Sequence, residues 1–260
     1  MKGNVAVLMQ LFAEQELKFQ SMALMLTFDE ESGGFNGVNY LLNEVGYSCD
    51  CAIVPDGGNN FRLITNQKGF LFIKISAQGK SAHGSRPWTG ENALEKLINV
   101  YSEIKKEFNF DSSSNYWQIT FNLGHLEGGN AVNKVPDQAT ALLDFRFPQR
   151  EDERKILNFF DKLIKDYQGL SYEVILTGAP LVSINNVYFD KLIKAAKRLG
   201  IKLKKDCDFP ASDARFFSAR NIPVLMFNPH CSPGHIDGEW VDLASLEKFY
   251  LLLVEFLRQK

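Results

Sequence analysis

Residues 24–34 read Leu24-Met25-Leu26-Thr27-Phe28-Asp29-Glu30-Glu31-Ser32-Gly33-Gly34, and this stretch decides the fold prediction. The apolar run over 24–28 is typical of a short buried strand. It leads into three adjacent carboxylates and a Ser-Gly-Gly turn, where glycine permits unusual backbone angles. Three acids at the end of a buried strand repel one another, so a metal ion or a solvated turn must compensate. The alternative is a helix start, with Asp29 or Ser32 as N-cap.

A second predicted strand also ends in an acid. Residues 49–58 read Cys49-Asp50-Cys51-Ala52-Ile53-Val54-Pro55-Asp56-Gly57-Gly58. An amphipathic helix is predicted over residues 4–19 and a short helix over 36–43. Strand, acid, helix, strand and acid thus follow in order. This order favours a layered α/β sheet with a site at the carboxyl ends of its strands.

The middle of the chain shows a different pattern. The sequence predicts strands over 70–77, 116–123, 138–147 and 171–176, with helices over 92–108 and 151–167. The order β-α-β-β-α-β is that of a ferredoxin-like sandwich. After Pro180 the first pattern returns, with helices over 187–199 and 243–257 and a strand over 224–227. We therefore predict a discontinuous α/β domain, residues 1–68 and 178–260, interrupted by an α+β insert over 69–177.

Composition and charge exclude several classes of protein. The 260 residues are 45% hydrophobic and 23% charged, as in ordinary globular proteins. A net charge of -2 argues against a nucleic-acid or anionic-membrane partner. No apolar run approaches the ~20 residues of a membrane span. Four cysteines in a chain this long do not indicate a secreted disulfide framework, so we expect a cytoplasmic protein.

Eight segments of the chain together resemble one family, the co-catalytic zinc amidohydrolases that include succinyl-diaminopimelate desuccinylase, acetylornithine deacetylase and glutamate carboxypeptidase. In chain order they are Asp29-Glu30-Glu31, Pro55-Asp56, Gly79-x-x-x-His83 with Pro87, Gly90-x-Asn92-Ala93, Asn133-x-Val135-Pro136, Asp144-x-Arg146, Ser212-Asp213-Ala214-Arg215 and His235. The resemblance implies a zinc-binding α/β domain interrupted by a lid domain, which often mediates homodimers. It also implies hydrolysis of amide bonds in N-acylated amino acids or small peptides.

The resemblance assigns roles to four residues of the α/β domain. It implies that Glu30 is the general base and that Glu31 and His235 are ligands of one zinc. Asp56 is then a ligand of the second zinc, and cobalt is a possible substitute metal. This division suits zinc chemistry, because bound zinc lowers the pKa of water and a neighbouring carboxylate can take the proton.

Four further residues have two readings each. A single loop histidine is more often a surface residue, but in dimeric relatives the residue matching His83 reaches the partner's site and stabilises the oxyanion. Asn133 and Arg215 are candidates to hold a substrate amide or carboxylate, because arginine binds carboxylates in a bidentate manner. Arg146, beside Asp144, is either a substrate residue or half of a structural ion pair.

The chain departs from the family pattern at its beginning. In relatives, a segment like Met1-Lys2-Gly3 follows an aspartate that bridges both metals, and a His-x-Asp motif lies further upstream. Neither occurs here, so the resemblance implies an internal methionine taken as a start or a degenerate remnant. We expect at most one weakly held zinc and impaired hydrolysis; the alternative is a non-catalytic protein whose lid is a dimerisation module.

A second zinc hypothesis involves the cysteines. Cys49, Cys51, Cys231 and His235 are a conceivable structural site, although the Cys-x-Cys spacing suits it poorly. Small buried thiols are the alternative.

Overall fold

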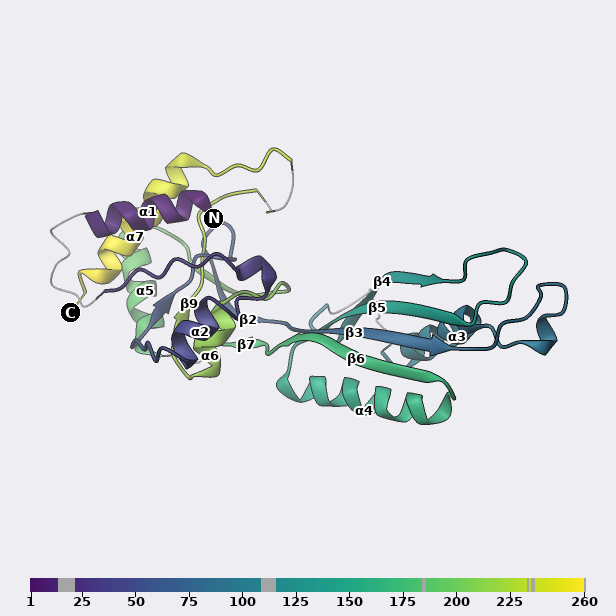
Figure 1. Cartoon of the computed structure of the whole chain (residues 1–260). Coiled ribbons are helices and arrows are strands. Elements are labelled where there is room, and N and C mark those ends of the chain that lie inside the picture. Colours follow the sequence, from purple (N-terminus) through teal and green to yellow (C-terminus); the bar gives the residue numbers. More distant parts are fainter. Residues whose placement is uncertain (14–21, 109–115, 184–185, 233, 235–236, 260) are drawn as a thin grey trace. The chain divides into compact units, whose positions relative to one another are not determined.

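The computed structural model describes residues 1–13, 22–108, 116–183, 186–232, 234 and 237–259. The chain divides into two compact units (Figure 1). Unit 1 comprises Met1–Gln67 and Leu181–Lys260, and unit 2 comprises Lys68–Pro180. The fold is mixed α/β with one unit inserted into the other, and the predicted fold class is confirmed.

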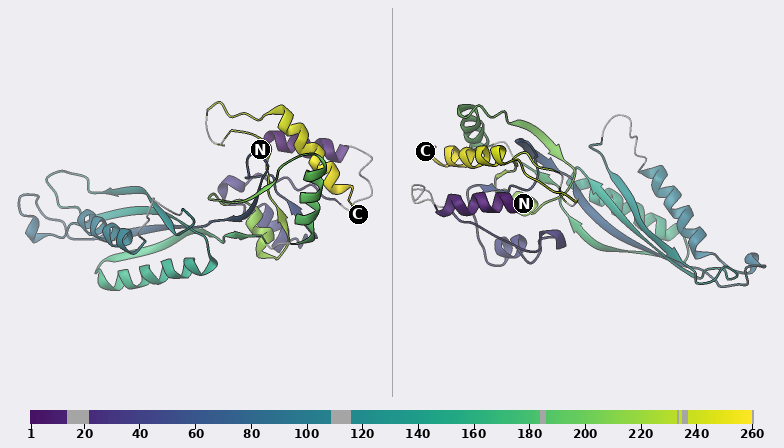
Figure 2. Two further views of the ribbon diagram at one scale, coloured as in Figure 1. Left: turned by 180° about the vertical axis from the view of Figure 1, so that it is seen from behind. Right: turned by 90° about the horizontal axis from the view of Figure 1, so that it is seen from above.

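Unit 2 is a four-stranded sheet with two helices against it (Figure 2). The strand order is β4-β5-β3-β6, and all neighbours are antiparallel. Its elements are β3 (Gly69–Gln78), α3 (Ala93–Glu107), β4 (Thr120–Gly128), β5 (Gln138–Phe147), α4 (Arg150–Asp166) and β6 (Leu170–Gly178), with a short 3-10 helix over Pro87–Thr89. This is the predicted β-α-β-β-α-β order.

The core of unit 2 follows from the residue pattern of its strands. In β3 every second side chain from Leu71 to Ala77 is buried, because successive side chains of a strand point to opposite faces. These side chains form one cluster with Leu97 of α3 and Phe160 of α4. The amide N–H groups of Leu94 and Glu95 donate to the side chain of Asn92, which caps α3.

Unit 1 combines helices with short strands. Strands β1 and β9 pair in parallel, and β2 lies between β7 and β8. The elements are α1 (Lys2–Ala13), a 3-10 helix over Glu30–Ser32, α2 (Val38–Asn43), β1 (Ala52–Ile53), β2 (Arg62–Gln67), β7 (Leu181–Val182), α5 (Val187–Arg198), β8 (Lys204–Asp208), α6 (Ala214–Ala219), β9 (Val224–Leu225) and α7 (Leu243–Leu257). Helices α1, α5 and α7 pack together around a core that includes Leu63, Phe189, Phe227 and Phe249.

The strand predicted over residues 24–28 is wrong. Residues 22–28 carry no strand, and Phe28 is 99% exposed. An apolar run needs a neighbouring strand to receive its backbone hydrogen bonds, and no described strand pairs with this segment. The helix-start reading lies closer to the structure, because a single 3-10 turn follows Asp29.

Other boundaries differ as well. The strand predicted over 49–58 is reduced to Ala52–Ile53. The first helix ends at Ala13, and residues 14–19 of the predicted helix lie outside the described residues. Strand β8 was missed because its sequence, Lys204-Lys205-Asp206-Cys207-Asp208, has no apolar run. Among the described helices none has the length and apolarity to cross a bilayer.

Candidate active site

The turn after Asp29 presents the candidate catalytic acids. The carboxylate Oδ2 of Asp29 accepts the N–H groups of Asn36 and Gly37 at 2.8 Å each. Within the turn, the N–H groups of Gly33 and Gly34 donate to the backbone carbonyls of Glu30 and Asp29. Both glycines have positive φ, 99° and 67°. The reversal of the chain, and not a regular strand, therefore sets the directions of Glu30 and Glu31.

Arg215 joins this turn to a distant part of unit 1. Its Nη1 donates to the carbonyl of Ser212 at 2.9 Å, and its Nη2 donates to the carbonyl of Gly33. The guanidinium lies over the ring of Phe216, 4.2 Å from the centroid, and the residue is only 4% exposed. Arg215 thus holds the acidic turn against α6. A contact between Arg215 and a substrate carboxylate or amide stays a prediction.

Asp213 packs directly against the turn. A Cβ atom built on Gly34 would lie 1.9 Å from Asp213 Oδ1. Asp213 is 6% exposed, and its Oδ1 has no hydrogen-bond partner within the described part of the chain. An unpaired buried carboxylate oxygen is costly, and such groups concentrate at functional sites. Asp213 is a site residue that the sequence predictions missed, and its place in the Ser212–Arg215 motif is the signal that could have revealed it.

The acids of unit 1 act on one another. The pKa of Glu30 is raised to about 7, mainly by burial and further by the nearby charges of Asp56, Asp213 and Glu31, whereas Arg215 opposes the shift. The pKa of Asp213 is raised to about 6, mainly by burial; Arg215 opposes this shift, whereas Asp29 and Asp56 contribute to it. The structure therefore brings Asp56 and Asp213 into the electrostatic neighbourhood of Glu30.

The donor side chains that the structure describes do not form a complete metal centre. Within the described ranges, no group of three or more His, Cys, Asp or Glu side chains is placed to hold one ion. Glu31 is exposed and Asp56 is half-buried. His235 lies outside the described residues. The assignment of Glu31, Asp56 and His235 as ligands remains a prediction.

The raised pKa values predict how the stability of the metal-free chain depends on pH. Glu30 and Asp213 titrate near 7 and 6 in the folded chain, against ordinary values of 4.5 and 3.8. At a pH between the ordinary and the raised pKa of either group, that group is deprotonated in the unfolded chain and still protonated in the folded chain. The free energy of unfolding therefore falls as pH rises from about 4 to about 7. Because Glu30 is only half-buried, we expect a loss on the order of 1 kcal/mol, or about 2–4 °C in Tm.

Thermal unfolding of the metal-free chain at several pH values measures this effect. Glu30→Gln and Asp213→Asn should each flatten the profile, because neither replacement side chain titrates. Glu44→Gln, at an exposed position in the same unit, is the matched control and should leave the profile unchanged. A wild-type Tm that rises over this pH range would contradict the prediction.

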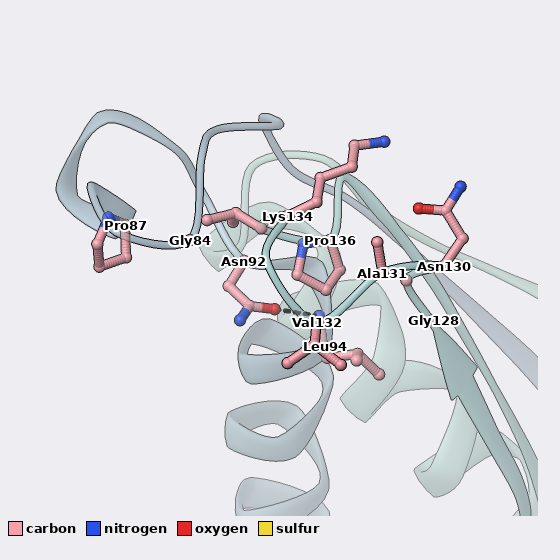
Figure 3. Close-up of a pocket in the computed structure, with 12 residues that line it drawn as sticks. Gly84, Pro87, Asn92, Leu94, Gly128, Asn130, Ala131, Val132, Lys134 and Pro136 are labelled. Carbon is pink, nitrogen blue, oxygen red and sulfur yellow. Dashed lines mark hydrogen bonds between the residues drawn. The ribbon is translucent and has the colours of Figure 1, made fainter.

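In unit 2, two predicted site residues lie on paired loops. The N–H of Gly84 donates to the carbonyl of Asn133 at 2.7 Å, and His83 forms an isolated antiparallel bridge with Lys134. Beside these loops lies an open cavity of about 500 Å³, whose lining includes Gly84 and Lys134 (Figure 3). The structure therefore brings the backbones of His83 and Asn133 together.

Arg146 lies elsewhere on the sheet of unit 2. Its guanidinium donates to both carboxylate oxygens of Asp144, at 2.8 and 3.0 Å, and lies over the rings of Phe70 and Phe72. Arg146 is opposite Phe70 in the ladder, whereas His83 follows the far end of β3 at Gln78, about 26 Å along the strand. The ion pair accounts for the charge of Arg146, and a substrate role remains a prediction.

The four-ligand cysteine hypothesis gains no support. The charges that shift the pKa of the Cys51 thiol are those of Cys49 and Asp50. The charges that shift the pKa of Cys231 are instead those of the N-terminal ammonium and Glu239, so the two thiols have different neighbours. Burial raises the pKa of Cys51 to about 12, so this thiol is protonated at neutral pH. All four cysteines are free.

Comparison with known proteins agrees with this architecture. Residues 65–169 match the peptidase dimerisation domain of M20 type. The chain is 31% identical over 242 residues to succinyl-diaminopimelate desuccinylase of Corynebacterium glutamicum, which covers 87% of this chain and 63% of that protein. It is 35% identical over 158 residues to a probable carboxypeptidase of Aspergillus clavatus, covering 56% of this chain and 37% of that protein.

Solved structures show the same fold. Aminopeptidase PepT from Bacillus cereus matches with a TM-score of 0.74 at 19% identity, over 89% of this chain and 62% of that one. A tripeptidase from Staphylococcus aureus matches with the same TM-score at 20% identity and the same coverage. The chain spans somewhat less than two thirds of the length of these desuccinylase relatives. The dimerisation-domain match, the similar sequences and the shared fold thus agree: in sequence and in architecture the chain is similar to peptidases and desuccinylases of M20 type.

Proposed function

We propose that this chain is a hydrolase of amide bonds in N-acylated amino acids or small peptides, with Glu30 as its general base. The single observation that carries this proposal is the state of Glu30, whose pKa of about 7 suits a proton acceptor near neutral pH. The names of the relatives, a desuccinylase and a probable carboxypeptidase, support the reaction class.

The surroundings of Glu30 support this role. Partial burial and neighbouring acids disfavour its charged form, so the carboxylate gains a proton readily from an attacking water. Arg215 fixes the turn through the carbonyl of Gly33, three residues after Glu30. A base held in this way can return its proton to the leaving amine.

M20 peptidases are generally metal-dependent, and we propose zinc for this chain, with Glu31 and His235 as ligands of one ion and Asp56 as a ligand of a second. The described donors do not complete a centre, so no step of the reaction is derived through the metal. His83 and Asn133, on the paired loops of unit 2, are proposed to contact the substrate carbonyl and its amide.

A hydrolysis assay tests the proposal. The chain is incubated with zinc or cobalt and with N-succinyl or N-acetyl amino acids, and released amine is measured. We expect slow release that Glu30→Gln abolishes and Glu44→Gln leaves unchanged. Equal release by the wild type and the Glu30→Gln variant would contradict the role of Glu30.

A second candidate function is a non-catalytic protein whose unit 2 acts as a dimerisation module. The observation that favours it is the incomplete donor set of the described residues. A dimer that releases no amine above background under any of these conditions would favour this candidate.

We also propose that the chain forms a homodimer through unit 2. The match of residues 65–169 to a peptidase dimerisation domain supports this. Light scattering coupled to gel filtration should then give about twice the chain mass of 29.4 kDa. A particle of one chain mass throughout a dilution series would contradict it.

A further inference from the structure

The loop that carries His83 is fixed at several points. The N–H of Val135 donates to the carbonyl of Ala82 at 2.9 Å, and the N–H of Arg86 donates to the carbonyl of His83 at 2.8 Å. At Gly84 a Cβ atom would lie 3.0–3.1 Å from backbone atoms of Asn133. Only glycine allows this close approach without displacement. The backbone of His83 therefore has a defined position from which its ring projects.

One ring nitrogen of His83 faces two donors from a single residue. The backbone N–H of Ser85 donates to His83 Nδ1 at 3.1 Å, and Ser85 Oγ lies 2.8 Å from the same nitrogen. A backbone N–H can only donate, so Nδ1 must offer a lone pair. The hydroxyl of Ser85 then donates to the same acceptor. In a neutral ring the remaining proton is on Nε2.

We propose that Ser85 is a positioning residue that holds His83 as the Nε2–H tautomer, so that the outward nitrogen of the ring is a hydrogen-bond donor. This inference rests on the proposed function, in which His83 acts on a substrate carbonyl. A donor aimed at an oxygen that gains negative charge stabilises the transition state, whereas a lone pair at the same place would repel it. The partner of the second nitrogen commonly sets the tautomer of a functional histidine.

Nuclear magnetic resonance of the full chain tests this without any need for activity. Long-range ¹H–¹⁵N correlation spectra identify which ring nitrogen carries the proton, and His83→Gln assigns the signals among the four histidines. At a pH where the ring is neutral, we expect the proton of wild-type His83 on Nε2. Ser85→Ala removes the hydroxyl and should move the tautomer ratio towards Nδ1–H by about threefold or more, because one hydrogen bond is lost.

Two variants serve as controls. Ser85→Thr keeps a hydroxyl and should restore the wild-type ratio. Ser81→Ala, at an exposed serine in the same loop, should leave the ratio unchanged. A wild-type proton on Nδ1, or a ratio that Ser85→Ala does not move, would overturn the proposal. Because the tautomer is read directly, a failure here is distinguishable from an absence of hydrolysis, which bears on the proposed function instead.

Discussion

Replacement of Gly34 by alanine should destabilise the folded chain by about 3 kcal/mol or more. Gly34 has a φ of 67°, where a side chain is strained. Its added Cβ would also lie 1.9 Å from Asp213 Oδ1 and 2.9 Å from the ring of Phe216. Asp213 and Phe216 are both buried, so neither can move aside cheaply. The two costs add, and the turn that carries Glu30 must shift.

Gly200→Ala is the matched control for this experiment. Gly200 has a nearly identical φ of 66°, but nothing lies within 4 Å of its added Cβ. It should therefore cost only the backbone strain, about 1 kcal/mol. Urea unfolding of the two variants measures the difference. Equal losses in the two variants would show that Asp213 does not press against Gly34 in solution.

The second large expected effect is a low zinc content together with a low rate of amide hydrolysis. We expect at most one loosely held zinc ion per chain after dialysis, and turnover at least about a thousandfold below the ~10 s⁻¹ median of enzymes. A catalytic zinc commonly has three protein ligands, whereas only Glu31 and His235 are proposed for one ion and Asp56 alone for the second. Elemental analysis paired with the amide hydrolysis assay measures both quantities.

Variants of the two adjacent glutamates divide metal binding from catalysis. Glu31→Gln should lower the zinc content further, whereas Glu30→Gln should keep the zinc content and lose the residual turnover. Two tightly held metals per chain, or turnover in the ordinary enzyme range, would show that the ligands are misplaced. Equal metal content and equal turnover in both variants would contradict the division of roles.

The sequence by itself determined the architecture of unit 2. Strand β5 has the predicted bounds, Gln138–Phe147, and helices α3 and α4 lie within one residue of their predicted limits. These elements carry a strong period of two or of 3.6, because one face of each packs on the same core. The closing helix α7, Leu243–Leu257, was predicted for the same reason. The local residue pattern is enough to predict a helix or strand when one apolar face of that element packs on the core.

The tertiary structure alone decided the details of the candidate site. Residues 24–28 have a strand-like sequence but no strand, because pairing depends on neighbours that the local sequence does not reveal. The spatial proximity of Asp213 to Glu30 joins segments more than 180 residues apart, and the contact of Arg215 with Gly33 does the same. No period in the sequence encodes such contacts. Burial and the combined charge of these groups, which set the pKa of Glu30, exist only once the chain has folded.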